Sequence, residues 1–212
     1  MGLAIKTGLL ADPAVNSTET ATLWRTQFDL INDLLEAHGW PCHREPERLA
    51  QRATRAQARS HSYTSLHRLR RVYAHAAADA QWTPSPLDEH GDPADDPLVR
   101  ALTERLDSHL LCHSDCEGFY VPVDFTELIF DDTRQLAGGV LGSSYRLLGE
   151  LVLVAPYIGV QLQAGVLTDE EATRLNRDIA TQENFWIEKQ AWLSLYEAAT
   201  LSIDHKTAIV FS

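Results

Sequence analysis

Apolar residues recur every three or four positions over much of the chain, which is the spacing of one face of an α-helix. The clearest case predicts a helix over residues 22–38, because Gly39 and Pro41 follow it as stop signals. The same spacing predicts a second helix over 46–60 and a third over 61–82.

Two capping patterns predict further helices. Asp96 followed by Pro97 is a favourable helix start, and leucines at four-residue steps continue the pattern from there toward residue 110. Thr168 and Glu171 form a capping box, in which each side chain satisfies a backbone donor at the other position. This box predicts one long helix that reaches Ala199.

Two segments have the pattern of strands instead. Apolar residues alternate over 118–123, and Pro122 would restrict that strand to the edge of a sheet, because proline has no N–H to donate. The apolar, β-branched tail at 207–212 is the expected pairing partner. The glycine-rich stretch 136–144 is a weak candidate phosphate loop, and we expect a flexible turn there.

These elements predict a mainly α protein, a single helical domain over 1–212 with a small two- or three-stranded β element. Residues 83–97 interrupt the helical pattern with four prolines, a glycine and five acids. Neither a helix nor a central strand tolerates that composition. We expect an exposed acidic loop, which is a candidate subdomain boundary.

Charge and cysteine usage narrow the class of protein. The net charge of -12 disfavours binding to nucleic acid, because a polyanion would be repelled. The chain shows neither a secretory signal nor a membrane span, and its three cysteines argue against a disulfide framework. A cytoplasmic bacterial protein is the expectation.

The stretch HLLCHSDCEGFYVPVDF, residues 109–125, concentrates the candidate chemistry. If the preceding helix continued through it, four zinc-type ligands would share one side of that helix. The ligands of this candidate zinc or other divalent metal site are His109, Cys112, His113 and Cys116. The alternative, which we favour, is that His109, Cys112 and Cys116 continue the apolar stripe of the preceding helix, since free cysteine is usually buried.

The acids of the same stretch allow other roles. Asp115 and Glu117 flank Cys116, and negative charge beside a thiol disfavours the reactive thiolate, so that cysteine is a poor nucleophile. Ser114, Asp115 and Glu117 could bind a ligand or partner, although residues of this kind before Gly118 commonly just form a turn.

An arginine stripe is the second candidate site. Within the predicted helix, arginines recur at steps of four, three and four: Arg48, Arg52, Arg55 and Arg59. The planar guanidinium suits phosphates and carboxylates, so an acidic protein or a phosphorylated small ligand would fit this face. The alternative is a solvated face, or one paired with the acids of the same chain.

Familiar catalytic signatures are missing from the sequence. The segments SYTSLHRLRRVYA (62–74), HLLCHSDCEGFYVPVDF (109–125) and LGSSYRLLGEL (141–151) resemble a family of uncharacterised bacterial proteins with an HSDCEGFYVP-type motif. That family has no assigned activity, so the resemblance implies a self-standing domain and no catalytic residue.

We therefore expect a cytoplasmic protein that binds a ligand or a protein partner without catalysis, of an immunity or regulatory type. The rival hypothesis is a metal-assisted hydrolase that uses the corner from His109 to Glu117, with a metal-activated water as nucleophile. The sequence does not decide between an enzyme and a binding protein, and it does not predict the oligomeric state.

Overall fold

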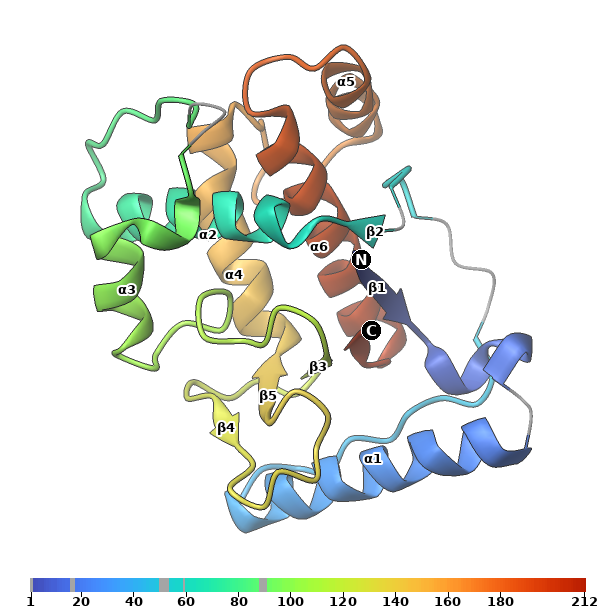
Figure 1. The fold of residues 1–212 in the computed structure, drawn as a ribbon. Helices are drawn as coiled ribbons and strands as arrows, with labels where there is room; N and C mark the ends of the chain where they lie inside the picture. Colours follow the sequence, from blue (N-terminus) through green and yellow to red (C-terminus); the bar gives the residue numbers. More distant parts are fainter. Residues whose placement is uncertain (1, 16–17, 50–53, 59, 88–90) are drawn as a thin grey trace.

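A computed structural model describes residues 2–15, 18–49, 54–58, 60–87 and 91–212. The helices in this part of the chain are α1 (Thr18–Ala37), α2 (Tyr63–Ala78), α3 (Pro97–Thr103), α4 (Ser144–Val154), α5 (Asp169–Ala180) and α6 (Trp186–His205). The strands are β1 (Leu3–Thr7), β2 (Ser60–His61), β3 (Gly118–Val121), β4 (Ile129–Phe130), β5 (Val140–Ser143) and β6 (Ile209–Phe211). They form one sheet in the order β2-β1-β6-β3-β5-β4 (Figure 1).

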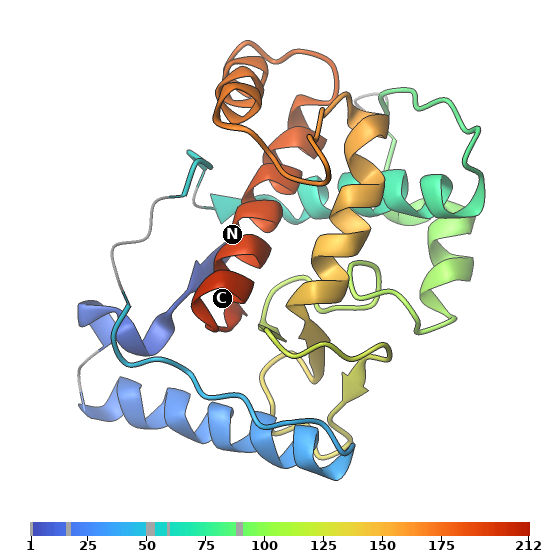
Figure 2. The same ribbon diagram turned by 180° about the vertical axis from the view of Figure 1, so that it is seen from behind.

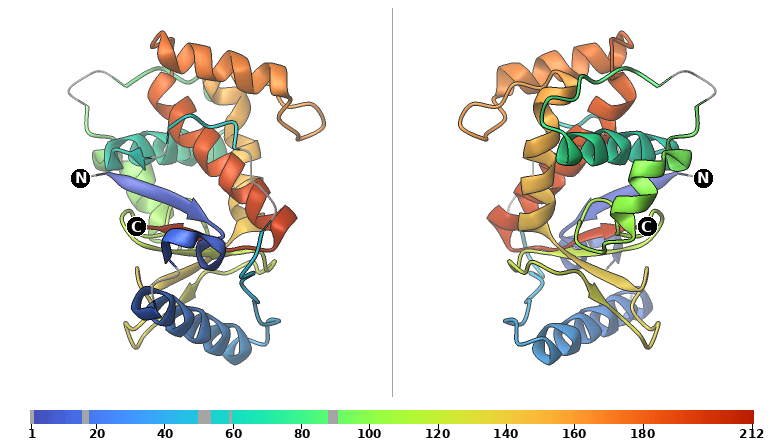
Figure 3. Two further views of the ribbon diagram at one scale, coloured as in Figure 1. Left: turned by 90° about the vertical axis from the view of Figure 1, so that its right-hand side faces the viewer. Right: turned by 90° about the vertical axis from the view of Figure 1, so that its left-hand side faces the viewer.

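The molecule has three layers, with the sheet in the middle. Helix α1 covers one face of the sheet, and α2, α4 and α6 cover the other, with α5 stacked outside them (Figure 3). Figure 2 shows the segment after α1 running back along that helix. Each face of the sheet has its own apolar core, because a helix layer and a sheet bury their apolar sides only against each other.

The central strand β3 shows how the two cores are separated. Phe119 and Val121 point toward α1 and join the core that contains Phe28, whereas Tyr120 points to the opposite face and joins the core of the helical layer. All four residues of β3 are buried. Alternation in this strand therefore distributes apolar residues between two cores and does not separate core from solvent.

The predicted fold class is wrong in its sheet, which has six strands and mixed pairing in place of a small element. The pairing of β3 with β5 is parallel, and every other pairing is antiparallel. The strands that the sequence did not reveal are five residues long or shorter, so they show too few alternations for a period of two to be recognised. Strand β5 includes Gly142, which resembled a turn residue.

The expected pairing of the tail with 118–123 is confirmed, since Phe119 lies opposite Val210 in an antiparallel register. The expected edge position is wrong, because β3 lies between β6 and β5. The strand ends at Val121, one residue before Pro122, so proline takes no place in the ladder.

The helices over 22–38 and 61–82 are confirmed in substance by α1 and α2. The helix over 46–60 is wrong, because residues 46–49 and 54–58 form neither helix nor strand. The long helix from residue 168 is also wrong. It is interrupted at 181–185, between α5 and α6, where Gln182 and Phe185 adopt positive φ angles of 55° and 62°.

The predicted N-caps are present, but the capping box is only half formed. The carboxylate of Asp96 accepts from the N–H of Leu98, and the hydroxyl of Thr168 accepts from the N–H of Glu171. The carboxylate of Glu171 accepts instead from the N–H of Gln161 and from Arg174. The helix that Asp96 starts nevertheless ends at Thr103, well before the corner at 109. Leu106, expected on its buried stripe, has a φ of 58° and is 50% exposed.

Within the described residues, no helix combines the length and the apolarity needed to cross a membrane.

Candidate protein-binding surface and polar clusters

Two of the four arginines of the predicted stripe are described by the structure, and these two do not share a helix face. Arg48 lies exposed in an irregular segment, and Arg55 is partly buried in another, while Arg52 and Arg59 lie outside the described residues. The helix on which their alignment depended is absent from 46–49 and 54–58.

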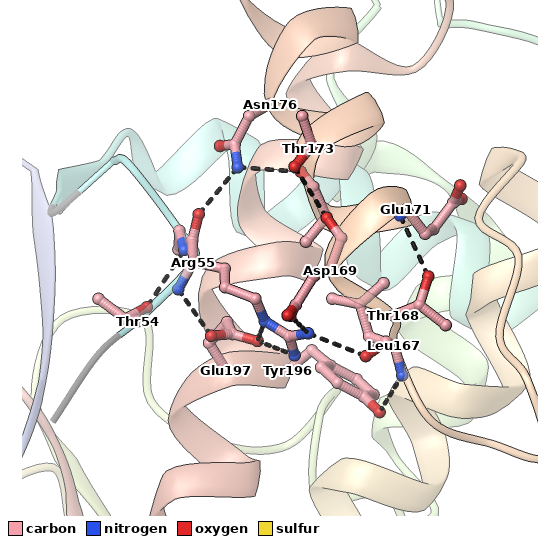
Figure 4. A network of polar contacts seen from close by, with 12 residues as sticks. Thr54, Arg55, Leu167, Thr168, Asp169, Glu171, Thr173, Asn176, Tyr196 and Glu197 are labelled. Atoms are coloured by element: carbon pink, nitrogen blue, oxygen red, sulfur yellow. Dashed lines mark hydrogen bonds and ion pairs between the residues drawn. The ribbon is translucent and has the colours of Figure 1, made fainter.

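Arg55 is instead bound by the helical layer (Figure 4). Its Nε and Nη2 atoms donate to Oε1 of Glu197 at 2.9 and 2.6 Å, and Nη1 donates to the carbonyl of Leu167 and to Asp169 at 2.9 and 3.0 Å. Burial would lower the pKa of Arg55, but its bonds to Glu197 and Asp169 outweigh burial and raise it. The acidic partners of this arginine therefore belong to its own chain.

A second carboxylate ties the segment after α1 to the sheet. Glu45 is buried, and its two oxygens accept from the hydroxyl of Thr207 at 2.5 Å and from the N–H of Ala208 at 2.7 Å. His43 contacts the same carboxylate at 2.8 Å, and its backbone N–H donates to Asn32 of α1. The segment is thereby attached both to α1 and to the strand that ends the chain.

The corner at 108–115 is held between an acidic and a basic side chain. Glu150 of α4 accepts from the N–H groups of His109 and Leu110 at 2.9 and 2.5 Å. Arg70 of α2 donates to the carbonyls of Leu110 and His113 at 2.7 and 2.6 Å, and it also binds the carboxylate of Asp115. One side chain thus satisfies the donors of the turn and another its acceptors, as buried backbone requires.

The two histidines of the corner are buried and form hydrogen bonds within the fold. The Nδ1 atom of His109 accepts from the N–H of Ser143 at 2.9 Å, so its Nε2 carries the proton and faces the carbonyl of Thr126 at 3.2 Å. His113 is stacked on Tyr120 at 4.0 Å between ring centres. Burial lowers the pKa of each imidazole to about 4, which keeps both neutral at pH 7.

The structure does not gather the four predicted metal ligands into a coordination shell. The thiol of Cys112 is half-buried near the carbonyl of Thr103, Cys116 is exposed, and both histidines are engaged as described above. Among the described residues, no group of three or more His, Cys, Asp or Glu could hold a metal ion. The metal site remains a prediction from the sequence, and its helical premise is wrong because α3 ends at Thr103.

The three polar residues of the predicted binding turn border two hollows, and Ser114 borders both. Asp115 lines a hollow of about 650 Å³ next to α2 and α3, and Glu117 lines one of about 730 Å³ that extends to Asp132. Burial would raise the pKa of Asp115, but His67 and Arg70 outweigh it and lower the pKa to about 2. Its charge is therefore used within the protein.

The outer side of α1 differs from all of these clusters. Asp29, Asp33 and Glu36 are exposed, and none of them forms an ion pair with a described residue. Steps of four and three residues place them on one side of the helix, away from the buried Phe28 and Ile31. We call these three residues the α1 acidic stripe. The periodicity that predicts the apolar side of this helix also marks its acidic side, which was not among the predicted sites.

Exposed acids predominate over the rest of the surface as well. Further exposed acids without an ion pair to any described residue are Glu19, Asp79, Asp92, Glu104, Asp107, Glu117, Glu127, Asp132, Glu170, Glu183 and Asp204. The exposed basic residues are fewer: Lys6, Arg25, Arg44, Arg48, Arg100, Arg105, Arg134, Arg146, Arg177 and Lys206. Several arginines are paired with groups inside the protein, and more acidic than basic residues are exposed, so the surface is negative.

No curated protein and no solved structure matches the chain. One family model matches residues 1–211, and its description is "Putative DNA-mimic protein". That description suggests a non-catalytic role in binding another protein, and it overturns the expectations about partners. It suggests a DNA-binding protein as the partner in place of the acidic protein or phosphorylated ligand, and so a link with nucleic-acid recognition that the charge of the chain had seemed to disfavour. With nearly its full length matched, the chain belongs to the family described as putative DNA-mimic proteins.

Proposed function

We propose that this protein acts as a DNA mimic: it occupies the DNA site of a DNA-binding protein and thereby competes with DNA. The observation that carries the proposal is the match of the family model to residues 1–211. The net charge of -12 and the excess of exposed, unpaired acids support it, because a DNA site is built to receive a dense row of negative charges.

The α1 acidic stripe has the spacing that such a site would accept. With a rise of about 1.5 Å per residue, its carboxylates follow one another at roughly 6 and 4.5 Å along the helix axis. Phosphates of one DNA strand follow at about 3.4 Å along the duplex axis, so the intervals are of the same order. The C-terminal end of α1 adds the negative pole of the helix dipole beside Glu36.

Two arginines that could have offset the acidic surface are engaged within the chain. Arg70 is buried, and Arg55 is bound by Glu197, Asp169 and the carbonyl of Leu167. Complementary potentials mainly accelerate association and determine which partners are accepted. Binding to a basic DNA site should therefore weaken steeply as the salt concentration rises.

The decisive experiment is competition. The protein, immobilised on a resin, would be exposed to an extract of cells that produce it, and retained proteins would be eluted with duplex DNA and identified. We expect a DNA-binding protein to be retained and released by DNA. Retained proteins that DNA does not release, or that have no affinity for DNA, would contradict the proposal.

A matched pair of variants separates a specific surface from net charge alone. The test variant is Asp29→Asn, Asp33→Asn, Glu36→Gln; the control variant is Asp79→Asn, Glu104→Gln, Glu183→Gln. Both remove three exposed acids. We expect a loss of about tenfold in affinity for the retained protein in the test variant and a smaller loss in the control. Equal losses would show that the α1 acidic stripe is not the contact surface.

A further inference from the structure

We propose that the carboxylate site that binds Arg55 is a guanidinium site for an arginine of the DNA-binding partner, and that Arg55 occupies it in the free protein as an internal competitor. The inference rests on the proposed function for the identity of the partner. It rests on the structure for the chemistry of the site, which lies between α5 and α6, away from α1 (Figures 1 and 4).

The site already shows how it recognises a guanidinium. Three of the donors on Arg55 meet Glu197 and the carbonyl of Leu167, and a fourth contact goes to Asp169. This arrangement of acceptors matches the planar fork of arginine and would leave the single ammonium group of lysine with fewer bonds. DNA-binding proteins present arginine in abundance, because arginine is their commonest means of contacting DNA.

The site cannot remain empty at low cost. The side chain of Glu197 is only 5% exposed, so removing its cation would leave a buried, unpaired carboxylate. An incoming arginine would replace Arg55 charge for charge, and the carboxylate would stay satisfied before and after the exchange. A site of this kind therefore favours substitution of one guanidinium by another over simple opening.

The surroundings leave room for such an exchange. Residues 54–58 form neither helix nor strand, so no regular element would have to unfold when Arg55 leaves. A hollow of about 580 Å³ adjoins the site and is lined by further acceptors, among them Asp204 and Thr200. The hydroxyl of Thr200 is buried and has no hydrogen-bond partner among the residues that the structure describes, and the side chain of Asp169 is 94% exposed.

Besides the side-chain bonds that an incoming guanidinium would replace, Arg55 would give up two backbone attachments. Its backbone N–H donates to Glu197 at 2.8 Å, and its carbonyl accepts from Asn176 at 2.8 Å. The Arg55 side chain is 30% exposed, so water can reach the edge of this contact. Both backbone groups could be hydrated after displacement.

Chemical rescue tests whether the site binds a free guanidinium. Arg55→Ala should lower the midpoint of thermal unfolding, and millimolar propylguanidinium should restore part of the loss, whereas propylammonium should not. Glu197→Gln combined with Arg55→Ala should abolish the rescue. If Arg55→Ala does not fold, refolding it with and without propylguanidinium gives the same comparison. Equal effects of the two cations, or rescue that persists with Glu197→Gln, would overturn the assignment.

Peptide binding tests the competition. Fluorescence anisotropy would measure the affinity of labelled nona-arginine for the wild type, for Arg55→Ala and for Arg48→Ala, a control with the same loss of charge from an exposed arginine. We expect Arg55→Ala to bind about tenfold more tightly than the wild type and Arg48→Ala to change little. Nona-lysine should gain much less from Arg55→Ala. Equal gains for the two variants, or for the two peptides, would overturn the proposal.

Failure of this inference is distinguishable from failure of the proposed function. Release of a retained protein by DNA, together with equal affinities of nona-arginine for the wild type and Arg55→Ala, would overturn only the proposal that Arg55 is an internal competitor. A guanidinium rescue with a tenfold gain in peptide affinity, but without any DNA-releasable partner, would overturn the DNA mimic and leave the guanidinium site in place.

Discussion

The corner at 108–115 and the α1 acidic stripe use the same kind of residue for opposite purposes. At the corner, Glu150 is mostly buried and accepts from two backbone N–H groups, and Asp115 is bound by Arg70. On α1, Asp33 and its two neighbours are exposed and form no ion pair with a described residue. The first set is committed to the fold, whereas the second is available to a partner.

The charged residues of a sequence indicate a binding surface only once those that are paired inside the fold are known. The sequence suggested an arginine surface and an acidic, ligand-binding corner, and in the structure both Arg55 and Asp115 are satisfied internally. What remains outside is acidic, and it is the surface that a basic DNA site would contact. Four measurements would test this distinction between residues that stabilise the fold and residues that are available to a partner.

The largest effect is expected from removing the cation of the corner. Arg70→Leu should lower the free energy of unfolding by about 3–5 kcal/mol, because the carbonyls of Leu110 and His113 and the carboxylate of Asp115 would lose their donor. Urea denaturation measures the loss. The matched control is Arg25→Ala, whose exposed pair with Glu47 should contribute about 0–1 kcal/mol. Similar losses in the two variants would refute the distinction between committed and available charges.

The pH dependence of stability should report the neutral histidines of the corner. Because the pKa of His109 falls from 6.5 to about 4 on folding, its contribution is complete above pH 6.5 and is lost as the pH falls toward 4. The loss could reach about 3 kcal/mol. The pKa of Glu150 is raised by burial to about 7, so its contribution is complete below pH 4.5 and is lost as the pH rises through 7.

Denaturation at several pH values would test this account of the corner. His109→Asn should reduce the loss of stability between pH 6.5 and 4, whereas His38→Asn, at an exposed histidine immediately after α1, should leave the profile of the wild type unchanged. An unaltered profile in His109→Asn would mean that this imidazole is not held neutral by the fold.

A smaller effect is expected at glycines, where the same contrast between interior and surface applies without charge. A Cβ at Gly142 would lie 2.3 Å from the ring of Tyr120, whereas one at Gly149, on the exposed side of α4, would meet nothing within 4 Å. Gly142→Ala should cost about 1–3 kcal/mol through overpacking, and Gly149→Ala should stabilise the protein by about 0.5–1 kcal/mol. Thermal unfolding of both variants decides whether β5 and β3 pack as closely as described.

The smallest effect on stability is expected from the α1 acidic stripe itself. Neutralising Asp29, Asp33 and Glu36 should change the free energy of unfolding by less than about 0.5 kcal/mol, because exposed side chains away from packing contribute little. A loss well beyond that value, measured by urea denaturation, would show that the stripe belongs to the fold and is not free to serve a partner.

Part of this architecture could be predicted from the sequence. The helix over 22–38 and the pairing of 118–123 with the tail are present as α1 and as the β3–β6 ladder, because apolar periodicity reports which side of an element is buried. The candidate sites were predicted less well. Arg48 and Arg55 do not share a helix face, and Asp115 and Glu117 border different hollows.

The missing parts share a physical cause. Strands such as β2 and β4 are two residues long, and they are stabilised by pairing with neighbours that are distant in sequence. Local pattern carries little information about such pairing. The helix predicted over 46–60 failed for a related reason, since Glu197 and Asn176 bind the backbone of Arg55 in an irregular conformation and override its local propensity.

The helices α1 and α2, the helix caps at Asp96 and Thr168, and the net negative charge follow from the sequence alone. These properties depend on neighbours within a few positions or on composition alone. Only the tertiary structure decided that six short strands join into one sheet, that Arg55 and Arg70 are bound internally, and that the α1 acidic stripe is left without an ion pair to a described residue. Each of these outcomes depends on which distant residues meet, and burial then determines which charges must be paired and which can face a partner.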